Sequence, residues 1–116
     1  MKKILLAFSL SLAASPAFAT GGFTCRTAGP NPIEATVGFG HAPGSPLVGS
    51  RLAENGRPIP VVHPQWWLDS SELRLVLTDP NAMRREAIIK TRRNGQFYDG
   101  SLWRGGKRRW VRCRES

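Results

Sequence analysis

The sequence predicts an all-β fold: a small antiparallel β-sandwich or β-barrel of about eight or nine short strands, with one disulfide. Two observations predict it. Short runs in which apolar and polar residues alternate recur along the chain. The pairs Asn55-Gly56, Asn94-Gly95 and Gly105-Gly106 separate several of these runs. Such pairs favour two-residue hairpins, because type I′ turns need positive φ at both central residues.

The first nineteen residues have the pattern of a secretory signal peptide. Residues 1–3 are basic, residues 4–14 are apolar, and Ala17-Phe18-Ala19 is a small-residue cleavage site. The apolar run is too short to span a membrane. A buried N-terminal helix or a membrane anchor is the alternative. We expect cleavage after Ala19, one all-β domain over residues 20–116, and a periplasmic or secreted location.

Cys25 and Cys113 are the two cysteines of the chain. In an oxidising compartment an even number of cysteines favours a disulfide. Two free buried thiols are the alternative, and metal binding by a lone cysteine pair is less favoured. A bond that closes nearly the whole domain stabilises it by about 4–5 kcal/mol in the chain-entropy model. It would also place the first strand beside the last and help to hide the sheet edges.

The strands expected before residue 80 are 22–27, 33–39, 47–54, 57–62, 65–68 and 72–78. Residues 40–46 form a loop by composition. Pro58 and Pro60 cannot donate ladder hydrogen bonds, so the strand that holds them is expected to lie at an edge or to be irregular, and His63-Pro64 should break it. Asp79 is expected to cap a turn or the first turn of a short helix.

The Asn55-Gly56 hairpin is expected to pair Glu54 with Arg57 and Leu52 with Ile59. The last third of the chain is a three-stranded meander over 84–93, 96–104 and 107–114. An Asn94-Gly95 turn predicts the pairs Arg93–Gln96, Thr91–Tyr98, Ile89–Gly100 and Ala87–Leu102. A Gly105-Gly106 turn predicts the pairs Leu102–Arg109, Gly100–Val111 and Tyr98–Cys113. Both turns put one apolar set toward the core: Ala87, Ile89, Tyr98, Gly100, Leu102 and Val111.

The opposite face of the meander interleaves aromatic rings with cations. The predicted cross-strand rows are Arg92–Phe97–Arg114, Lys90–Asp99–Arg112, Ile88–Ser101–Trp110 and Glu86–Trp103–Arg108. This face is either a solvent-facing basic, aromatic surface or one wall of a second buried layer. In the second case the tryptophans pack over the sheet beneath arginine stems. Trp66 has the parity to join the core, which leaves Trp67 facing outward.

The positive charge is concentrated in the meander. The formal net charge is +9, whereas residues 83–116 hold eleven Lys or Arg and three acids, a balance of +8. A concentrated basic face attracts anionic partners, although a solvated arginine-rich surface has the same composition.

Catalytic and metal-binding patterns are scarce. The chain has no G-x-S-x-G, no H-E-x-x-H and no glycine-rich phosphate loop before a helix. The acids are scattered, and the cations expected beside Asp99 would hold it ionised. His41 and His63 have no ligand spacing. We therefore expect no enzymatic activity, no cofactor and no metal site.

The opening FTCRTAG, the terminal cysteines and the small all-β layout resemble those of the small periplasmic inhibitors of C-type lysozyme. The resemblance implies an inhibitor of an envelope-acting enzyme. Those inhibitors carry a Ser-Gly…Tyr motif and a Lys-Gly motif, whereas this chain has a single tyrosine, Tyr98, and Gly106-Lys107 in the reverse order. Such lysozymes are also basic, so the two positively charged proteins would repel each other on encounter. No site residue is carried over.

The leading hypothesis is a non-enzymatic periplasmic or secreted binding module that presents a basic, aromatic sheet face to an anionic envelope partner. That partner is an anionic polymer or an acidic protein, with nucleic acid less favoured. An inhibitor or modulator of a secreted or envelope-acting enzyme, acting through loops such as 39–46, is the alternative, and a weak hydrolase is a third. The predicted ligand-binding residues are Lys90, Arg92, Phe97, Trp103, Arg108, Trp110 and Arg112.

Overall fold

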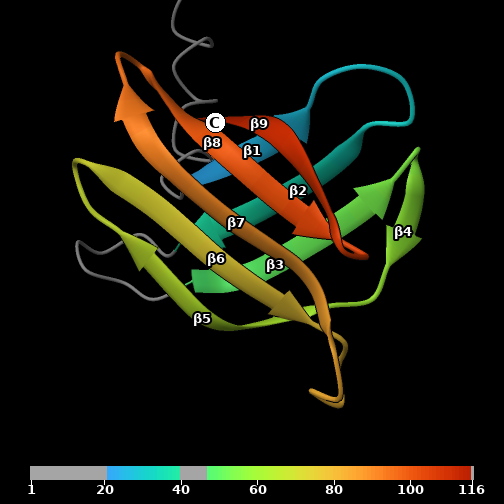
Figure 1. Ribbon diagram of the computed structural model, residues 1–116. Helices are drawn as coiled ribbons and strands as arrows, with labels where there is room; N and C mark the ends of the chain where they lie inside the picture. The colour runs from blue at the N-terminus through green and yellow to red at the C-terminus, as the bar shows by residue number, and fades with distance from the viewer. Residues whose placement is uncertain (1–20, 40–46, 116) are drawn as a thin grey trace, which may run out of the picture.

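A computed structural model describes residues 21–39 and 47–115 of the chain. These residues form nine β-strands and no helix (Figure 1), as the all-β prediction requires. No helix of the described segments has the length and apolar character needed to cross a membrane. The strands are β1 (Gly22–Thr27), β2 (Ile33–Phe39), β3 (Leu47–Glu54), β4 (Arg57–Ile59), β5 (Val62–Leu68), β6 (Glu72–Thr78), β7 (Arg85–Asn94), β8 (Phe97–Arg104) and β9 (Lys107–Glu115).

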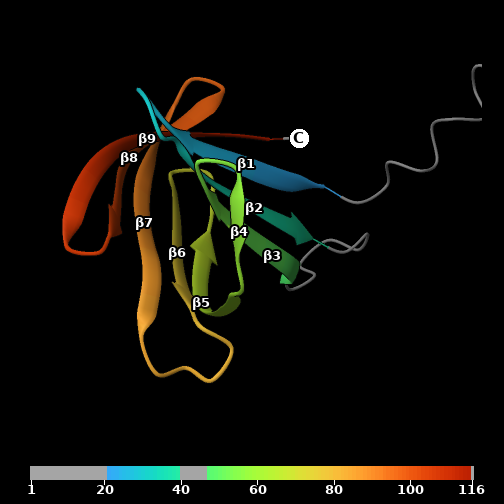
Figure 2. The same ribbon diagram turned by 90° about the vertical axis from the view of Figure 1, so that its right-hand side faces the viewer.

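All nine strands belong to one antiparallel sheet, in the order β4-β3-β2-β1-β9-β8-β7-β6-β5. The sheet curls into a half-barrel, so that β6, β7 and β8 lie in front of β1, β2 and β3 in Figure 1, with a side view in Figure 2. The two edge strands, β4 and β5, follow each other in the chain. Across the opening, the Ser50 Oγ of β3 lies 2.9 Å from the His63 Nδ1 of β5. The curl therefore brings the two ends of the sheet toward each other.

The hydrophobic core fills the concave side of the curled sheet. Alternate residues of each strand point inward, and the buried apolar side chains form one cluster. Its fully buried members include Leu52 on β3, and Leu75, Ile89 and Leu102 on β6, β7 and β8. The inward face predicted for the meander is confirmed, since Ala87, Ile89, Tyr98, Leu102 and Val111 are buried and Gly100 is half-buried.

The predicted disulfide between Cys25 and Cys113 is present. The two residues lie directly opposite each other on β1 and β9, and both are fully buried. The prediction that the first strand lies beside the last is confirmed as well. The bond therefore crosses the one strand pair that joins the N-terminal four strands to the C-terminal five.

The predicted pairing of β7 with β8 is wrong by one turn position. The turn residues are Gly95 and Gln96, so Asn94 pairs with Phe97, and Thr91 pairs with Gly100 rather than Tyr98. Gly95 has φ of 66° and Asn94 remains in the extended strand, which fits a type II′ turn with glycine in its first central position. The shift moves every partner by two residues, so each side chain keeps its predicted face.

The two other predicted hairpins are confirmed. Gly105 and Gly106 have φ of 58° and 79° and connect β8 to β9 in the expected register. Asn55-Gly56 connects β3 to β4, pairing Leu52 with Ile59. The strand predicted over 57–62 lies at an edge, as expected, but it ends at Ile59.

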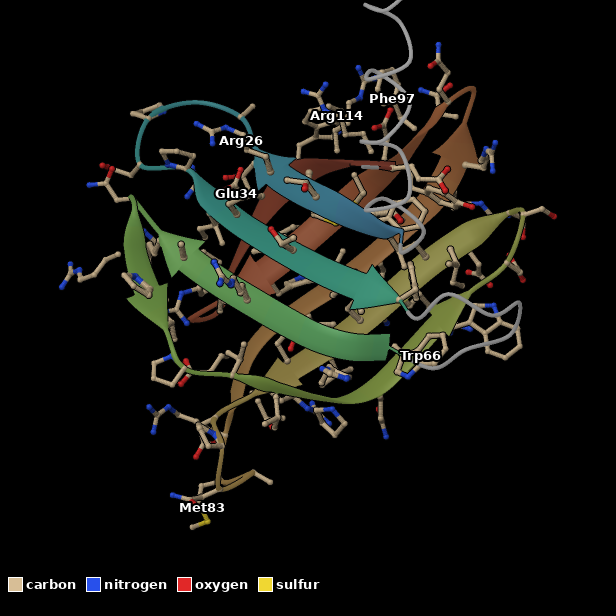
Figure 3. The ribbon with its side chains drawn as sticks, turned by 180° about the vertical axis from the view of Figure 1, so that it is seen from behind. Arg26, Glu34, Trp66, Met83, Phe97 and Arg114 are labelled. Atoms are coloured by element: carbon tan, nitrogen blue, oxygen red, sulfur yellow. A yellow bond between two sulfur atoms is a disulfide. The ribbon has the colours of Figure 1, made fainter. Side chains whose placement is uncertain are left out.

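The break expected at His63-Pro64 does not occur, since both residues lie within β5. β5 is the other edge strand and pairs with a neighbour on one side only, so Pro64 costs the sheet no hydrogen bonds on a second side. The register is irregular between Val62 and Gln65. The short helix considered after Asp79 does not form. Asp79 instead accepts backbone hydrogen bonds from Met83 and Arg84, each at 2.7 Å, and holds a turn whose exposed tip carries Met83 (Figure 3).

Replacing Leu102 tests the core. Leu102 is fully buried, so Leu102→Ala should lower the free energy of unfolding by about 2–5 kcal/mol in urea denaturation. Met83→Ala is the matched control, because Met83 is 79% exposed and its truncation should change stability by less than about 0.5 kcal/mol. Equal effects of the two variants would contradict the inward orientation of Leu102.

Removing the disulfide tests the junction between the two halves of the sheet. The double variant Cys25→Ser, Cys113→Ser should lose about 4–5 kcal/mol of unfolding free energy, because the bond closes a loop with a sequence separation of 88 residues. Denaturation of the reduced wild-type protein should show a similar loss. If the oxidised and reduced proteins unfold at the same urea concentration, the bond does not contribute in this way.

Candidate functional site

All seven residues predicted to bind an anionic partner lie on the outer, convex face of β7, β8 and β9. Trp110 is 51% exposed, and Lys90, Arg92 and Arg108 are exposed, while Phe97, Trp103 and Arg112 are half-buried. This face is therefore a solvent-facing surface in the described structure rather than the wall of a second buried layer.

The neighbours predicted on this face are correct between β8 and β9 and wrong between β7 and β8. The revised turn moves each β7 residue along by two positions. Asp99 lies between Arg92 and Arg112 instead of between Lys90 and Arg112. The observed rows are Asn94–Phe97–Arg114, Arg92–Asp99–Arg112, Lys90–Ser101–Trp110 and Ile88–Trp103–Arg108.

Arg112 is held by Asp99 in a two-point ion pair. Its Nε and terminal nitrogen donate to the two carboxylate oxygens at 2.8 and 2.9 Å. Its guanidinium carbon also lies 4.1 Å from the centroid of the Phe97 ring and 5.4 Å from that of Trp110. The hydrogen bond from Arg112 keeps the pKa of Asp99 below its ordinary value, against the opposing effect of burial. Arg112 therefore orients two aromatic rings, and its charge is largely compensated.

Lys90 and Arg108 flank the Trp103 side chain. The Lys90 Nζ lies 5.8 Å from the Trp103 ring centroid, a cation–π contact, and Arg108 is the direct β9 neighbour of Trp103. Arg108 donates a hydrogen bond from Nε to Ser101 Oγ at 2.8 Å. Within the described residues neither cation forms an ion pair. These two charges remain available to a ligand.

Other arginines of the meander serve the fold. Arg104 reaches across the half-barrel to Glu54 at 2.8 Å and to Glu86 at 2.9 Å. Arg109 donates to three carbonyl groups of the β1–β2 turn, including Asn31 O at 2.9 Å. These two arginines therefore contribute to internal contacts rather than to a free basic surface.

The strand order extends the aromatic and basic surface beyond the predicted residues. Direct cross-strand neighbours on five strands form a line that we call the tryptophan row: Trp67, Arg74, Lys90, Ser101 and Trp110. A second line runs beside it and contains Gln65, Val76, Ile88, Trp103 and Arg108. We call the surface between these two lines the cross-strand groove. Over β5, β6 and β7 it is hollowed by about 310 Å³.

Trp67 ends this groove in a fixed orientation. Its Nε1 donates to Asp69 Oδ2 at 2.9 Å, and the Arg74 guanidinium lies 5.7 Å from its ring centroid. Asp69 also accepts backbone hydrogen bonds from Ser71 and Glu72, each at 2.8 Å; these bonds, that from Ser71 foremost, hold its pKa far below the ordinary value. The outward orientation of Trp67 was predicted from parity. Its alignment with Trp110 requires the strand order, which the sequence pattern does not contain.

Ser50 and His63 form a contact that the sequence analysis missed. The hydroxyl and imidazole lie 2.9 Å apart, although they come from β3 and β5. Activated serine nucleophiles use such a pair together with a third group that orients the imidazole. Among the described residues no carboxylate hydrogen-bonds this ring, so the pair joins the two ends of the sheet without completing that arrangement.

The described part of the chain has no candidate metal site. Nowhere in residues 21–39 or 47–115 do three side chains of His, Cys, Asp or Glu come together. His41 and most of the loop 39–46, on which the enzyme-modulator alternative depends, lie outside the described residues.

Replacing Asp99 tests the ion pair by its pH dependence. A carboxyl whose pKa is lower in the folded state contributes stability above its unfolded pKa of about 3.9 and loses it as the pH falls through the folded value. Asp99→Asn should therefore cost about 1–2 kcal/mol at pH 7 and progressively less below about pH 4. Urea denaturation across this range measures the difference.

Glu34→Gln is the matched control for Asp99→Asn. The Glu34 carboxylate meets Arg26 at 3.4 Å with both side chains largely exposed, as Figure 3 shows on the outside of β1 and β2. Its replacement should cost less than about 0.5 kcal/mol. A loss in Asp99→Asn that is the same at pH 7 and below pH 4 would contradict the charge-dependent role of the Asp99 carboxylate.

Comparison of the chain with protein-family models, with curated proteins and with solved structures gave no match.

Proposed function

We propose that this protein is a non-enzymatic binding module of the periplasm or the extracellular space, which holds an anionic polymer of the cell envelope on its outer sheet face. One observation carries the proposal: Lys90 and Arg108 keep uncompensated charges beside Trp103 and Trp110. Cations supply attraction to any polyanion, and exposed aromatic rings supply contact area with directional preference.

Two further features support the proposed location. The signal-peptide pattern of residues 1–19 favours export, and the Cys25–Cys113 bond suits an oxidising compartment. An exported protein with an exposed basic surface meets the acidic glycans and lipid headgroups of the envelope before it meets nucleic acid. These considerations support an envelope polymer as the partner.

The structure changes the choice of test residues. Arg112 belongs to the predicted binding set, but its pairing with Asp99 leaves little free charge. Replacing it would also disturb Phe97 and Trp110, whose rings it contacts. Lys90 and Arg108 are the sharper targets, because both are exposed and their side chains form no ion pair in the described residues.

The proposal is tested by salt titration of the double variant Lys90→Gln, Arg108→Gln. Wild-type affinity for a sulfated glycan such as heparin should fall steeply with salt, because each neutralised charge releases counterions. The variant should bind more weakly and show a salt slope smaller by about one for each cation removed. Calorimetric titrations at several salt concentrations measure both quantities.

The matched control is Arg51→Gln, Arg57→Gln, which removes two exposed charges from β3 and β4. It should leave the salt slope nearly unchanged. Lipopolysaccharide and single-stranded DNA are titrated in parallel as alternative polyanions. The proposal is wrong if the wild-type protein binds none of the three at low salt, or if both double variants lose the same affinity.

A further inference from the structure

We propose that the ligand of this surface is a linear acidic glycan that lies across the strands in the cross-strand groove, with one end on Trp110 and the other on Trp67. The inference rests on the proposed function and assigns to it a substrate class and a binding direction. It also adds β5 and β6 to a surface that the sequence analysis confined to β7, β8 and β9.

The two end tryptophans define the length of the site. They are members of one row of direct neighbours, separated by four strand-to-strand steps. At about 4.8 Å per step this gives about 19 Å along the sheet. Trp67 is 50% exposed and Trp110 is 51% exposed, so each end offers an open ring surface. An extended polymer reaches both rings, whereas a small molecule reaches only one.

The rings are already oriented before a ligand arrives. Trp67 is fixed by its bond to Asp69 and by Arg74, and Trp110 has the Arg112 guanidinium 5.4 Å from its centroid. Little side-chain freedom is then lost on binding, which favours affinity. In both cases an arginine lies beside the tryptophan ring, and about half of the tryptophan remains exposed.

The lining of the groove matches the two sides of a sugar ring. Val76 and Ile88 are half-buried apolar residues on the line beside the tryptophan row. Arg74 and Lys90, both exposed, supply donors for hydroxyl and carboxylate groups. A pyranose ring has an apolar face of C–H groups and a polar edge of hydroxyls. An apolar floor with donors along one side is complementary to such a ring.

The charge pattern next to the groove favours a glycan over nucleic acid. The neighbouring row of six strands mixes acids and bases. Glu72, Arg92, Asp99 and Arg112 alternate in charge, Arg26 follows Arg112 as a second base, and Glu34 ends the row. This row carries three acids and three bases, so it offers hydrogen-bond acceptors as well as donors. A polymer with hydroxyls beside its carboxylates uses both, whereas the phosphodiester backbone of single-stranded DNA has acceptors but no hydroxyl donors.

The aromatic spacing leads to the same conclusion. Single-stranded nucleic acids bind such faces by stacking successive bases on closely spaced rings. Trp67 and Trp110 are separated by about 19 Å, which is too far for adjacent bases to stack on both. Trp103 is the diagonal neighbour of Trp110, but it is half-buried and has Lys90 as a cation–π neighbour, so it offers less open ring surface for a second base.

The test uses linear oligogalacturonic acids of increasing length, with affinity measured by calorimetry and by quenching of tryptophan fluorescence. For the wild-type protein, affinity should rise with length until an oligomer reaches about 19 Å, and then level off. Trp67→Ala should weaken binding of the long oligomers about ten-fold or more and that of the shortest ones by no more than about two-fold, because a short oligomer contacts one ring at a time and keeps the Trp110 end.

Trp66→Ala is the matched control on the same strand. Trp66 is 37% exposed, but it points to the other side of β5, where its ring contacts Phe39 at 6.3 Å between centroids. It should not alter affinity at any length, and circular dichroism establishes that both variants fold. Equal effects of the two replacements, or an affinity independent of length, would overturn the inference.

Parallel titrations separate this inference from the proposed function. If the protein binds single-stranded DNA or lipopolysaccharide through Lys90 and Arg108 but does not bind oligogalacturonates, the glycan assignment is wrong and the polyanion-binding function stands. If it binds no polyanion at low salt, both are wrong. Binding of the glycan that depends on Trp110 but never on Trp67 would rule out the proposed direction across the strands.

Discussion

The pairing of β1 with β9 is the interaction on which the rest of the structure depends. β1 to β4 form one meander in which each strand pairs with the next, and β5 to β9 form another. The two meanders become a single sheet only where β1 lies against β9. The Cys25–Cys113 bond lies within this pair. A covalent link at the junction offsets the loop-closure entropy of bringing the two ends of the domain together, which local hairpins do not require.

This junction places the arginine-rich β9 in the interior of the sheet instead of at an edge. Its outward side chains therefore have neighbours on both sides, from β8 and from β1. Arg112 lies between Asp99 of β8 and Arg26 of β1, and Arg26 in turn lies beside Glu34 of β2. Arg112 and Arg26 are like charges side by side, but each also has an acidic neighbour, and these two acids limit the repulsion within the row. The fold thus accommodates part of its basic composition through ion pairs such as those of Arg104 and Arg112. These structural cations differ from Lys90 and Arg108, which form no ion pair in the described residues.

The sequence was sufficient to predict the faces of the strands but not all of their partners. The alternation of Tyr98, Gly100 and Leu102 fixes which side is buried, whatever the turn, because a shift by two residues preserves parity. Asn94-Gly95 allows either of two adjacent turns, and the choice between them depends on backbone conformation that composition does not reveal. The groove that joins Trp67 to Trp110 was beyond prediction for a different reason. Those residues become aligned only through the order and register of five strands.

The curled shape also decides which surface can bind a partner. In a small half-barrel the concave side is used by the core, and buried residues such as Leu52, Leu75 and Ile89 meet there from both layers. A ligand site on that side would require removing apolar packing that a domain of this size needs for its stability.

The outer face has no such constraint, because its side chains have little role in the core. The exposed tryptophans, together with Lys90 and Arg108, therefore add contact area and charge where the fold is least affected by them. The hydrogen bond of Trp67 to Asp69 and the contact of Trp110 with Arg112 hold those rings in place without burying them. Rigid rings on an outer surface contribute little to the folding free energy, and the geometry that they keep is what a long, extended ligand would recognise.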